Sequence, residues 1–232
     1  MAESAAASDK TMSAGGQAVA AVLMVGLVAA CITVLAHVLP QNQAVAEPAT
    51  CSKEDHRLPA KYVSGTQLCT ALNRPDLPTL LGTPDEQAAS ASAGGGWVTV
   101  AGDGKFASPE AEVTLASYSV KLSTSYDTFS VGEMSGLLGR SAEPREVLGH
   151  PAVLYSDRTI AITFGPGRKA DTGPGGVARS LMIAKDPKDG GGSYQVVIWR
   201  QDDVPPDDAA LFRVAEAVLP TVPGWTAGRT AG

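Results

Sequence analysis

Residues 180–200 read SLMIAKDPKDGGGSYQVVIWR, and this stretch decides the fold class. The segments 180–185 and 193–200 are rich in apolar and β-branched residues, which are typical of strands. Between them lies Asp189-Gly190-Gly191-Gly192, whose Asp-Gly start suits a turn that requires positive φ. The stretch therefore predicts an antiparallel β-hairpin.

Further strands are expected on the N-terminal side of this hairpin. Apolar residues alternate along residues 112–126, and their phase slips by one, which predicts a β-bulge near Ala116 or Ser117. Two other apolar runs flank Asp157-Arg158 and predict a second hairpin with its turn there. Residues 87–96 are expected to form a loop. The remaining candidate strands are 97–101, 147–156 and 159–164.

Helices are expected at both ends of this strand region. Ser64 can cap a helix over Gly65–Asn73, and residues 131–138 predict a short helix. The last helix begins near Pro206 and ends at Pro220. Hairpins between terminal helices predict an α+β domain, in which helices pack at one face of an antiparallel sheet of about five to six strands.

A long apolar run precedes this domain. Ala18–Leu39 contains no Asp, Glu, Lys or Arg, and as a helix it would span roughly 33 Å, enough to cross a hydrocarbon core of about 30 Å. The run predicts a single N-terminal transmembrane helix whose partner is the lipid bilayer.

Three fates remain open for this segment. It can be retained as a signal anchor, which its length favours, because the h-region of a cleaved signal peptide is usually shorter. It can instead be cut after Ala46, where Ala44-Val45-Ala46 forms a small-x-small site. Lipidation at Cys31 is the third fate, although apolar residues continue for a further eight positions to Leu39.

The expected organisation follows from this anchor. Lys10 lies before the run and Lys53, Arg57 and Lys61 follow it, so a literal positive-inside count would leave the large domain in the cytoplasm. Long domains translocate largely regardless of charge, and the cysteine usage favours an oxidising compartment, so we expect the domain outside. The expected segments are a disordered tail (1–17), the transmembrane helix (18–39), a stalk (40–60), the extracytoplasmic domain (61–226) and a disordered C-terminal tail (227–232).

Composition restricts the partners. The chain has 18 Lys and Arg against 24 Asp and Glu, a net charge of −6. Charges of both signs are interspersed, and no basic block marks a nucleic-acid surface, so no nucleic-acid partner is expected.

Two of the three cysteines lie beyond the apolar run. Cys51 and Cys69 form an even pair, which predicts a disulfide in an extracytoplasmic domain. Two buried free thiols are the alternative. A zinc site is disfavoured because His56 alone cannot complete four ligands.

No motif assigns a catalytic, cofactor-binding or metal-ligating residue. Gly132-Glu133-Met134-Ser135-Gly136 lacks the spacing of a serine-hydrolase elbow, and His150 is the base that a serine relay would require. Asp202, Asp203, Asp207 and Asp208 form the densest acidic patch, which we interpret as a helix cap and solvated loop.

Two further groups have a structural interpretation. Gly173-Pro174-Gly175-Gly176 lacks the lysine of a phosphate-binding loop and predicts a loop between strands. The three tryptophans, Trp97, Trp199 and Trp225, are interpreted as core rather than as a carbohydrate platform.

Several longer strings carry a resemblance. They are Cys51 to Cys69 followed by Ala71-Leu72-Asn73-Arg74-Pro75-Asp76-Leu77-Pro78, then residues 155–162 (YSDRTIAI), 173–176 (GPGG) and 199–208 (WRQDDVPPDD). With these strings, residues 51–226 resemble an uncharacterised actinobacterial family of membrane-anchored extracytoplasmic proteins, a domain of unknown function. The resemblance implies an extracytoplasmic domain behind one anchor helix, and it implies no activity or ligand.

The expected function is therefore a non-enzymatic binding or interaction module of the cell envelope, whose partner is an envelope protein or ligand. The alternative is a cell-envelope hydrolase with dispersed catalytic residues. Asp157, Arg158 and Arg200 are the candidate interaction residues.

Overall fold

The computed structural model describes residues 49–52, 58–100, 104–138, 141–164, 170–202 and 204–228. The chain divides into two compact units, residues 1–46 and 47–232, and every described residue belongs to the second. The expected membrane helix Ala18–Leu39, together with Cys31 and His56, lies outside the described residues. No helix within the described part of the chain is long and apolar enough to cross a membrane.

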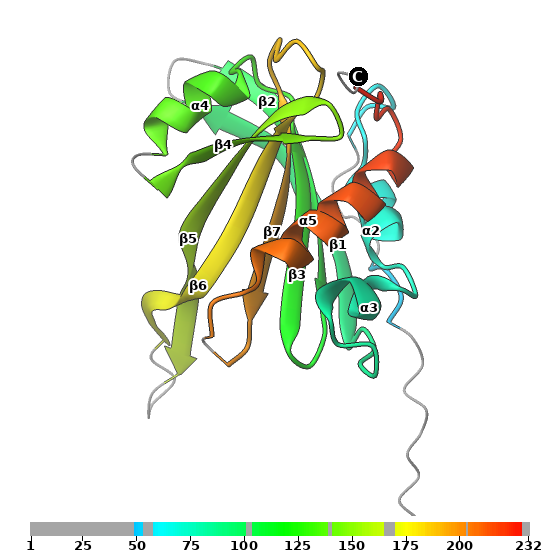
Figure 1. Cartoon of the computed structure of the whole chain (residues 1–232), viewed down its shortest axis with the longest axis vertical. Helices are drawn as coiled ribbons and strands as arrows, with labels where there is room; N and C mark the ends of the chain where they lie inside the picture. Colours follow the sequence, from blue (N-terminus) through cyan, green and yellow to red (C-terminus); the bar gives the residue numbers. More distant parts are fainter. Residues whose placement is uncertain are drawn as a thin grey trace, which may run out of the picture. The chain divides into compact units, whose positions relative to one another are not determined.

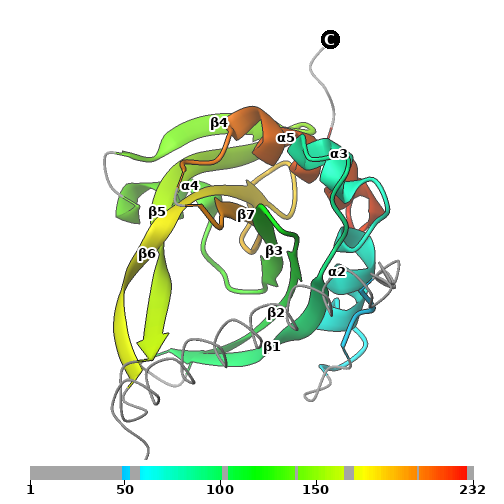
Figure 2. The same ribbon diagram turned by 90° about the horizontal axis from the view of Figure 1, so that it is seen from below.

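A single antiparallel sheet forms the centre of the second unit (Figure 1). It has seven strands in the order β1-β2-β3-β7-β6-β5-β4, so the predicted class, α+β, is confirmed and the predicted strand number is too low. Seen from below, the sheet curves, and the β1–β2 and β5–β6 hairpins form its two arms (Figure 2). The strands are β1 (Ser90–Val100), β2 (Gly104–Thr114), β3 (Tyr118–Ser125), β4 (Glu143–Val147), β5 (His150–Phe164), β6 (Ala170–Ala184) and β7 (Ser193–Arg200).

The hairpin predicted from residues 180–200 is present. Strand β6 pairs with β7, with Ala184 opposite Ser193 at the turn and Ala178 opposite Trp199. The turn takes positive φ at Asp189, Gly191 and Gly192, as the Asp-Gly start predicted.

The second predicted hairpin is wrong. Asp157-Arg158 lies inside β5, and a register shift against β6 follows between Arg158 and Ile160. Gly173–Gly176, expected to be a loop, lies within β6. This part of the β5–β6 hairpin is exposed (Ile160 is 77% exposed), so polar residues and glycine occur here without marking a turn.

The first three strands also differ from the prediction. Strand β1 extends from Ser90 and includes most of the segment that was expected to be a loop. Its pairing with β2 places Gly95 at φ +82°, where any side chain would collide with the backbone of β2. The slip predicted as a bulge near Ser117 is instead the β2–β3 turn, in which the Leu115 amide donates to the Tyr118 carbonyl at 2.7 Å.

Four α-helices and one 3₁₀ helix lie among the described residues. The helix starts follow their caps: Ser64 and Gln67 form a capping box for the first helix, and Ser130 and Glu133 do so for the third. Asp189 of the β6–β7 turn also accepts hydrogen bonds from the Val131 and Gly132 amides. The helices are α2 (Gly65–Leu72), α3 (Leu77–Leu81), α4 (Val131–Leu137), α5 (Asp208–Val218) and η2 (Leu219–Thr221).

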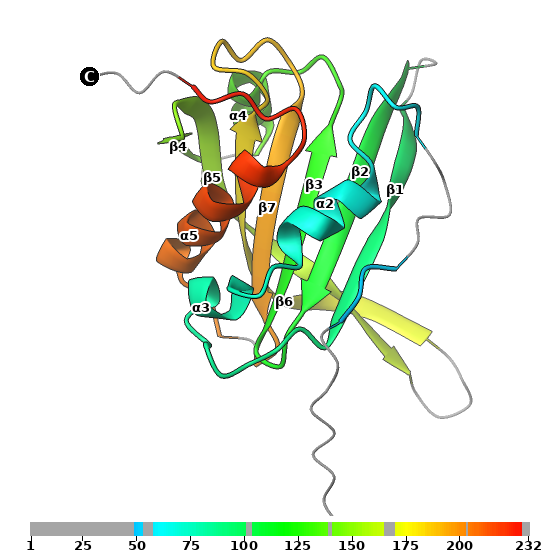
Figure 3. The ribbon, with the colours of Figure 1, turned by 90° about the vertical axis from the view of Figure 1, so that its right-hand side faces the viewer.

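The helices cover both faces of the sheet, which corrects the expectation of one face. Because side chains alternate along a strand, Leu154 and Leu181 face the main core with α2, α3 and α5, whereas Val153 and Met182 face a smaller cluster with α4. Figure 3 shows α2, α3 and α5 in front of the sheet and α4 behind its upper end.

The predicted disulfide is confirmed. Cys51 and Cys69 are bonded, with their Cα atoms 6.0 Å apart. The bond joins the segment 49–52 to α2, and the same segment forms a parallel bridge to β1 at Ala91.

Candidate functional site

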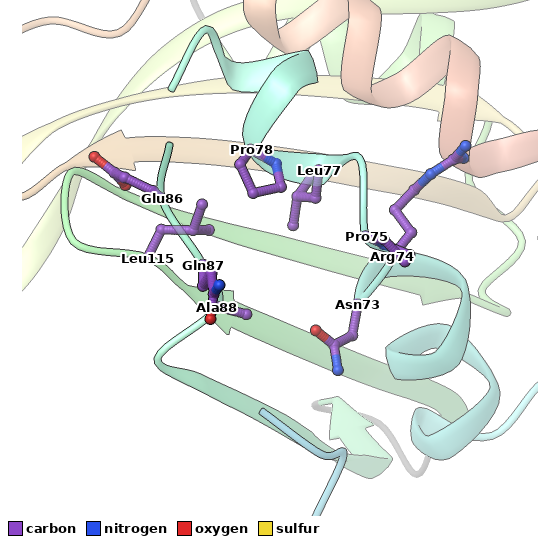
Figure 4. A pocket seen from close by; sticks show the side chains of 9 residues that line it. All are labelled: Asn73, Arg74, Pro75, Leu77, Pro78, Glu86, Gln87, Ala88 and Leu115. Atoms are coloured by element: carbon purple, nitrogen blue, oxygen red, sulfur yellow. The ribbon is translucent and has the colours of Figure 1, made fainter. Parts of the chain in front are cut away.

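Two concavities among the described residues have the features of ligand sites. The first is a pocket of about 250 Å³ between the α2–α3 turn, the segment before β1 and the β2–β3 turn (Figure 4). We call it the loop pocket. It is lined by Asn73, Arg74, Pro75, Leu77, Pro78, Glu86, Gln87, Ala88 and Leu115.

The α2–α3 turn is held in place on two sides. The side-chain amide of Asn73 donates to the Ala49 carbonyl at 2.6 Å. The Arg74 guanidinium donates to the Ala217 carbonyl of α5 at 2.6 Å and pairs with Asp76, so it reaches toward α5 in Figure 4. This pairing lowers the pKa of the Asp76 carboxyl from its ordinary value.

The floor of the loop pocket is apolar, and its two charged side chains, Arg74 and Glu86, already have partners in the protein. Leu77, Pro78 and Leu115 are buried. Glu86 accepts hydrogen bonds from the Ser117 amide, at 3.1 Å, and from the Ser117 hydroxyl. The exposed Gln87 amide lies at the rim. The pocket is thus suited to an uncharged apolar group with one polar end.

The second concavity lies where α2, β3 and the β6–β7 hairpin meet. Its volume is about 310 Å³, and we call it the tyrosine pocket. It is lined by Ala60, Lys61, Tyr62, Val63, Gln67, Tyr126, Lys185, Tyr194, Pro223 and Gly224.

Three tyrosine rings and two lysine ammonium groups line the tyrosine pocket. The Lys185 Nζ lies 3.0 Å from the centre of the Tyr126 ring and 5.4 Å from that of Tyr194. Tyr62 packs edge-on against Tyr126, with ring centres 4.8 Å apart, and also against Trp97 at 5.5 Å. The Tyr126 hydroxyl accepts a hydrogen bond from the Val63 amide at 2.9 Å, which fixes its ring.

Burial shifts the titration of these groups. Partial burial lowers the pKa of Lys185 from 10.5 to about 8, because it disfavours the charged ammonium. Burial raises the pKa of the Tyr126 hydroxyl and raises that of Tyr194 to about 12. A group with a perturbed pKa inside a concavity is a feature of functional sites.

Residues 9–141 match the model of a family of unknown function, DUF6215. The chain belongs to this family. No curated protein and no solved structure matches it. The match includes the α2–α3 turn, Asn73–Pro78, which lines the loop pocket. Because the function of DUF6215 is unknown, the match assigns no activity.

The second face of the sheet in this DUF6215 chain carries a polar row. The Lys121 ammonium pairs with Glu110 at 2.5 Å, and Glu112 lies opposite Lys121 in the neighbouring strand. Partial burial raises the pKa of the Glu112 carboxyl, although Lys121 opposes that shift. Next to this row, the Tyr155 hydroxyl accepts a hydrogen bond from the Gln195 amide.

The candidate interaction residues do not form one site. Asp157 and Arg158 are exposed neighbours in β5, where the Arg158 guanidinium donates to the Gly175 carbonyl at 3.3 Å. Arg200 ends β7, pairs with Asp202 and donates to the Tyr118 hydroxyl at 3.2 Å. Strand β6 lies between β5 and β7 and separates the two groups.

The histidine and serine weighed for a hydrolase relay do not hydrogen-bond to each other among the described residues. His150 is fully buried, and its Nδ1 and Nε2 lie 2.9 Å and 2.7 Å from the carbonyl oxygens of Ala184 and Thr226. Both ring nitrogens are therefore occupied by backbone. Ser135 lies within α4 and not on a strand-to-helix turn.

The acidic patch serves the start of α5, as the sequence indicated. Asp207 caps the helix through the Ala209 amide at 3.0 Å, and Asp208 pairs with Arg179. Asp203 lies outside the described residues. Among the described residues, no three His, Cys, Asp or Glu side chains converge as a metal site would require.

The tryptophans differ from one another. Trp225 packs against the main core, as expected. Trp97 is 43% exposed, so its interpretation as core is wrong, and the Lys105 Nζ lies 4.8 Å from the centre of a Trp97 ring.

Sequence reasoning missed the tyrosine pocket. Tyr62, Tyr126 and Tyr194 are about 65 positions apart along the chain and belong to no local motif. Lys185 follows the last residue of β6, where the sequence indicates only the end of a strand. The one signal that the sequence offered was a lysine directly after an apolar run, residues 181–184.

Proposed function

We propose that the chain is a tethered binding domain of the cell envelope, held on the bilayer by Ala18–Leu39 with residues 47–232 outside the cytoplasm. The uncharged apolar run supports the tether. The Cys51–Cys69 bond supports an oxidising compartment, since disulfides persist outside the reducing cytosol. We also propose that the chain comes from an actinobacterium, as the resemblance implies.

The observation that carries the binding role is the loop pocket. Its floor is apolar, and Arg74 and Glu86 at its rim are engaged with Asp76 and Ser117. A charged ligand would find no free partner among these two groups. We infer an uncharged ligand with a short alkyl or ring body, because 250 Å³ is slightly smaller than the usual pocket for a drug-sized ligand.

A binding role fits these residues better than hydrolysis. The base that a serine relay would use, His150, has both ring nitrogens against backbone carbonyl oxygens. A general base must reach the proton that it abstracts. Nothing on the described residues favours the hydrolase alternative.

Filling the loop pocket tests the binding site. Ala88 lines the pocket and Ala209 is exposed at the start of α5, so Ala88→Phe and Ala209→Phe form a matched pair. We expect n-hexanol to shift amide NMR signals of the α2–α3 turn in the wild-type and Ala209→Phe chains, and not in Ala88→Phe. Equal shifts in both variants, or none in the wild type, would remove the pocket from the proposal.

Fractionation tests the tether. The full chain, expressed in an actinobacterial host, is expected to stay with carbonate-washed membranes, whereas a chain lacking residues 18–39 is not. A thiol reagent that does not cross the membrane should label Cys51 and Cys69 on intact cells only after reduction. Recovery of the intact chain in the soluble fraction with reduced thiols would contradict both the tether and the location.

A further inference from the structure

We propose that the tyrosine pocket is a second, separate binding site, and that it takes a small organic anion. The carboxylate or phosphate of this ligand pairs with Lys185, and its apolar part lies on the tyrosine rings.

The first step is the missing counter-charge of Lys185. Five of the ten other cations of the described chain, Arg74, Lys121, Arg145, Arg179 and Arg200, pair with a carboxylate. The five that do not, Lys61, Lys105, Arg158, Lys188 and Arg213, are exposed, whereas Lys185 is half-buried. The Lys185 ammonium makes no ion pair or hydrogen bond to the described residues. It lies instead over the ring faces of Tyr126 and Tyr194, in cation–π contacts. Ring faces attract a cation, but they do not replace the three acceptors that an ammonium can use.

The second step is the fixed position of this side chain. The Lys185 amide donates to the Gly192 carbonyl at 3.2 Å across the β6–β7 turn. Gly192 has φ +72°, and a Cβ there would lie 2.9 Å from both the Lys185 Cδ and the Ser125 carbonyl oxygen. The glycine thus leaves just enough space for the lysine stem between the turn and β3. A side chain held in this way loses little entropy when a ligand binds.

The third step is the character of the pocket walls. Lys61 is a second cation at the pocket, with its Nζ 4.9 Å from the centre of the Tyr62 ring. No Asp or Glu lines the pocket. Two cations without a lining carboxylate favour an anion, and the faces and edges of tyrosine rings favour a flat or apolar body next to it. The volume of about 310 Å³ suits a small molecule.

The fourth step gives the site a pH signature. The titratable groups that face Lys185 are Tyr126 and Tyr194, with Lys61 and Tyr62 at the same pocket. Burial raises the pKa values of Tyr126 and Tyr194, so both stay neutral at pH 9. The pKa of Lys185 is about 8, and its ammonium is therefore the form that is lost between pH 7 and pH 9. Anion affinity should fall over this range by about tenfold, since binding then requires uptake of a proton.

Calorimetric titration with benzoate and benzamide tests the proposal. The two probes have nearly the same shape, and benzoate keeps its charge between pH 7 and pH 9. We expect benzoate to bind the wild-type chain at pH 7 at least tenfold more tightly than benzamide, and about tenfold more weakly at pH 9. Absence of benzoate binding at pH 7, or equal binding of both probes, would overturn the proposal.

Two lysine variants locate the binding. Lys185→Met keeps the length of the side chain and removes its charge, whereas Lys188→Met changes an exposed lysine of the adjacent turn. Benzoate affinity should fall at least tenfold in Lys185→Met and stay unchanged in Lys188→Met. Retained affinity in Lys185→Met would place the anion elsewhere. If Lys185→Met does not fold, the comparison of benzoate affinity at pH 7 and pH 9 still tests the proposal, because it uses the wild-type chain alone.

The loop pocket is tested independently. Ala88→Phe, which fills the loop pocket, is expected to leave benzoate affinity unchanged, because the lining residues of the two pockets do not overlap. Loss of hexanol binding with intact benzoate binding would therefore support two sites, whereas loss of benzoate binding in Ala88→Phe would place the anion in the loop pocket and overturn the proposal.

Discussion

At the scale of single residues, His150 is a buried polar ring whose partners define its role. It begins β5, its ring stacks on Trp225 with centres 4.3 Å apart, and its nitrogens face carbonyl oxygens of Ala184 and Thr226. The histidine thus joins the end of β6 to the segment after η2. Hydrogen bonds to buried groups matter chiefly because their loss leaves a partner unsatisfied.

Replacing His150 should therefore destabilise the domain. We expect His150→Leu to lower the free energy of unfolding by about 2–4 kcal/mol, because the ring contact with Trp225 is lost and the backbone carbonyl oxygen that accepts from the imidazole N–H loses its donor. Urea denaturation followed by tryptophan fluorescence measures this change. His150→Gln, which can keep one donor, should lose less. A loss below about 0.5 kcal/mol, the usual range of surface substitutions, would contradict this role of His150.

Glu112 gives a prediction for the pH dependence of stability. Burial raises the pKa of its carboxyl in the folded chain. The ionised form is then less favourable in the folded than in the unfolded state, so this group costs stability at neutral pH and no longer does so once both states are protonated. Glu112→Gln should raise the midpoint of thermal unfolding at pH 7, and the gain should shrink as the pH falls through the raised pKa of the folded chain and be lost below about 4.5, the ordinary value of the unfolded chain.

A carboxylate elsewhere in the sheet provides the control for this experiment. Glu146 is exposed in β4, so Glu146→Gln should change the midpoint little at either pH. A gain from Glu112→Gln that persists unchanged at low pH would show that the carboxyl charge is not the cause.

At the scale of elements, α2 lies directly on the backbone of the first two strands. A Cβ added at Gly65 would lie 2.5 Å from the Gly94 carbonyl oxygen and 2.9 Å from that of Glu110. The first residue of the helix must therefore be glycine for α2 to approach β1 and β2 this closely.

This close approach reverses the usual effect of a glycine-to-alanine substitution. Within a helix such a change normally stabilises by about 1 kcal/mol, but Gly65→Ala should destabilise by about 1–3 kcal/mol, because α2 has to move away from the sheet. Gly132→Ala in α4 is the matched control, since its Cβ would meet the nearest atom at 3.5 Å. It should be neutral or stabilising in the same denaturation experiment. A stabilising Gly65→Ala would show that the helix can shift at no cost.

The elements differ in how far the sequence could predict them. The β6–β7 hairpin and α2 were predicted because a local turn or a capping box specifies each of them. Strand β1 was not predicted, because seven of its eleven residues are Ser, Ala or Gly, which have low strand propensity. Its pairing with β2 stabilises the strand in place of propensity. The same holds for Gly173–Gly176 in β6. Backbone pairing with a distant strand leaves no local signal.

At the scale of the whole molecule, the ligand sites were less predictable than the fold class. Hairpins between helices predicted an α+β domain, and two cysteines predicted the disulfide. The loop pocket was not predicted, because Asn73–Pro78 belonged to a resemblance that implied no ligand. The tyrosine pocket depends on β3, β7 and the segment before α2 meeting in space, and only the folded chain brings their tyrosines together.

The attachment of the N-terminal segment also belongs to this scale. Residues 49–52 are held by the Cys51–Cys69 bond, by the bridge to Ala91 and by the Asn73 amide on the Ala49 carbonyl. The disulfide closes a loop of 18 positions, and the chain-entropy model gives it about 3 kcal/mol.

Reduction should therefore lower the free energy of unfolding of the whole domain by about 3 kcal/mol, because the unfolded chain regains the entropy of the open loop. Urea denaturation with and without dithiothreitol measures this difference. A chain carrying Cys51→Ala and Cys69→Ala should match the reduced wild type and show no response to dithiothreitol. If reduction leaves the transition unchanged, the disulfide adds no stability beyond the contacts that segment 49–52 makes with Ala91, Ala93 and Asn73, and the chain-entropy account of this bond is wrong.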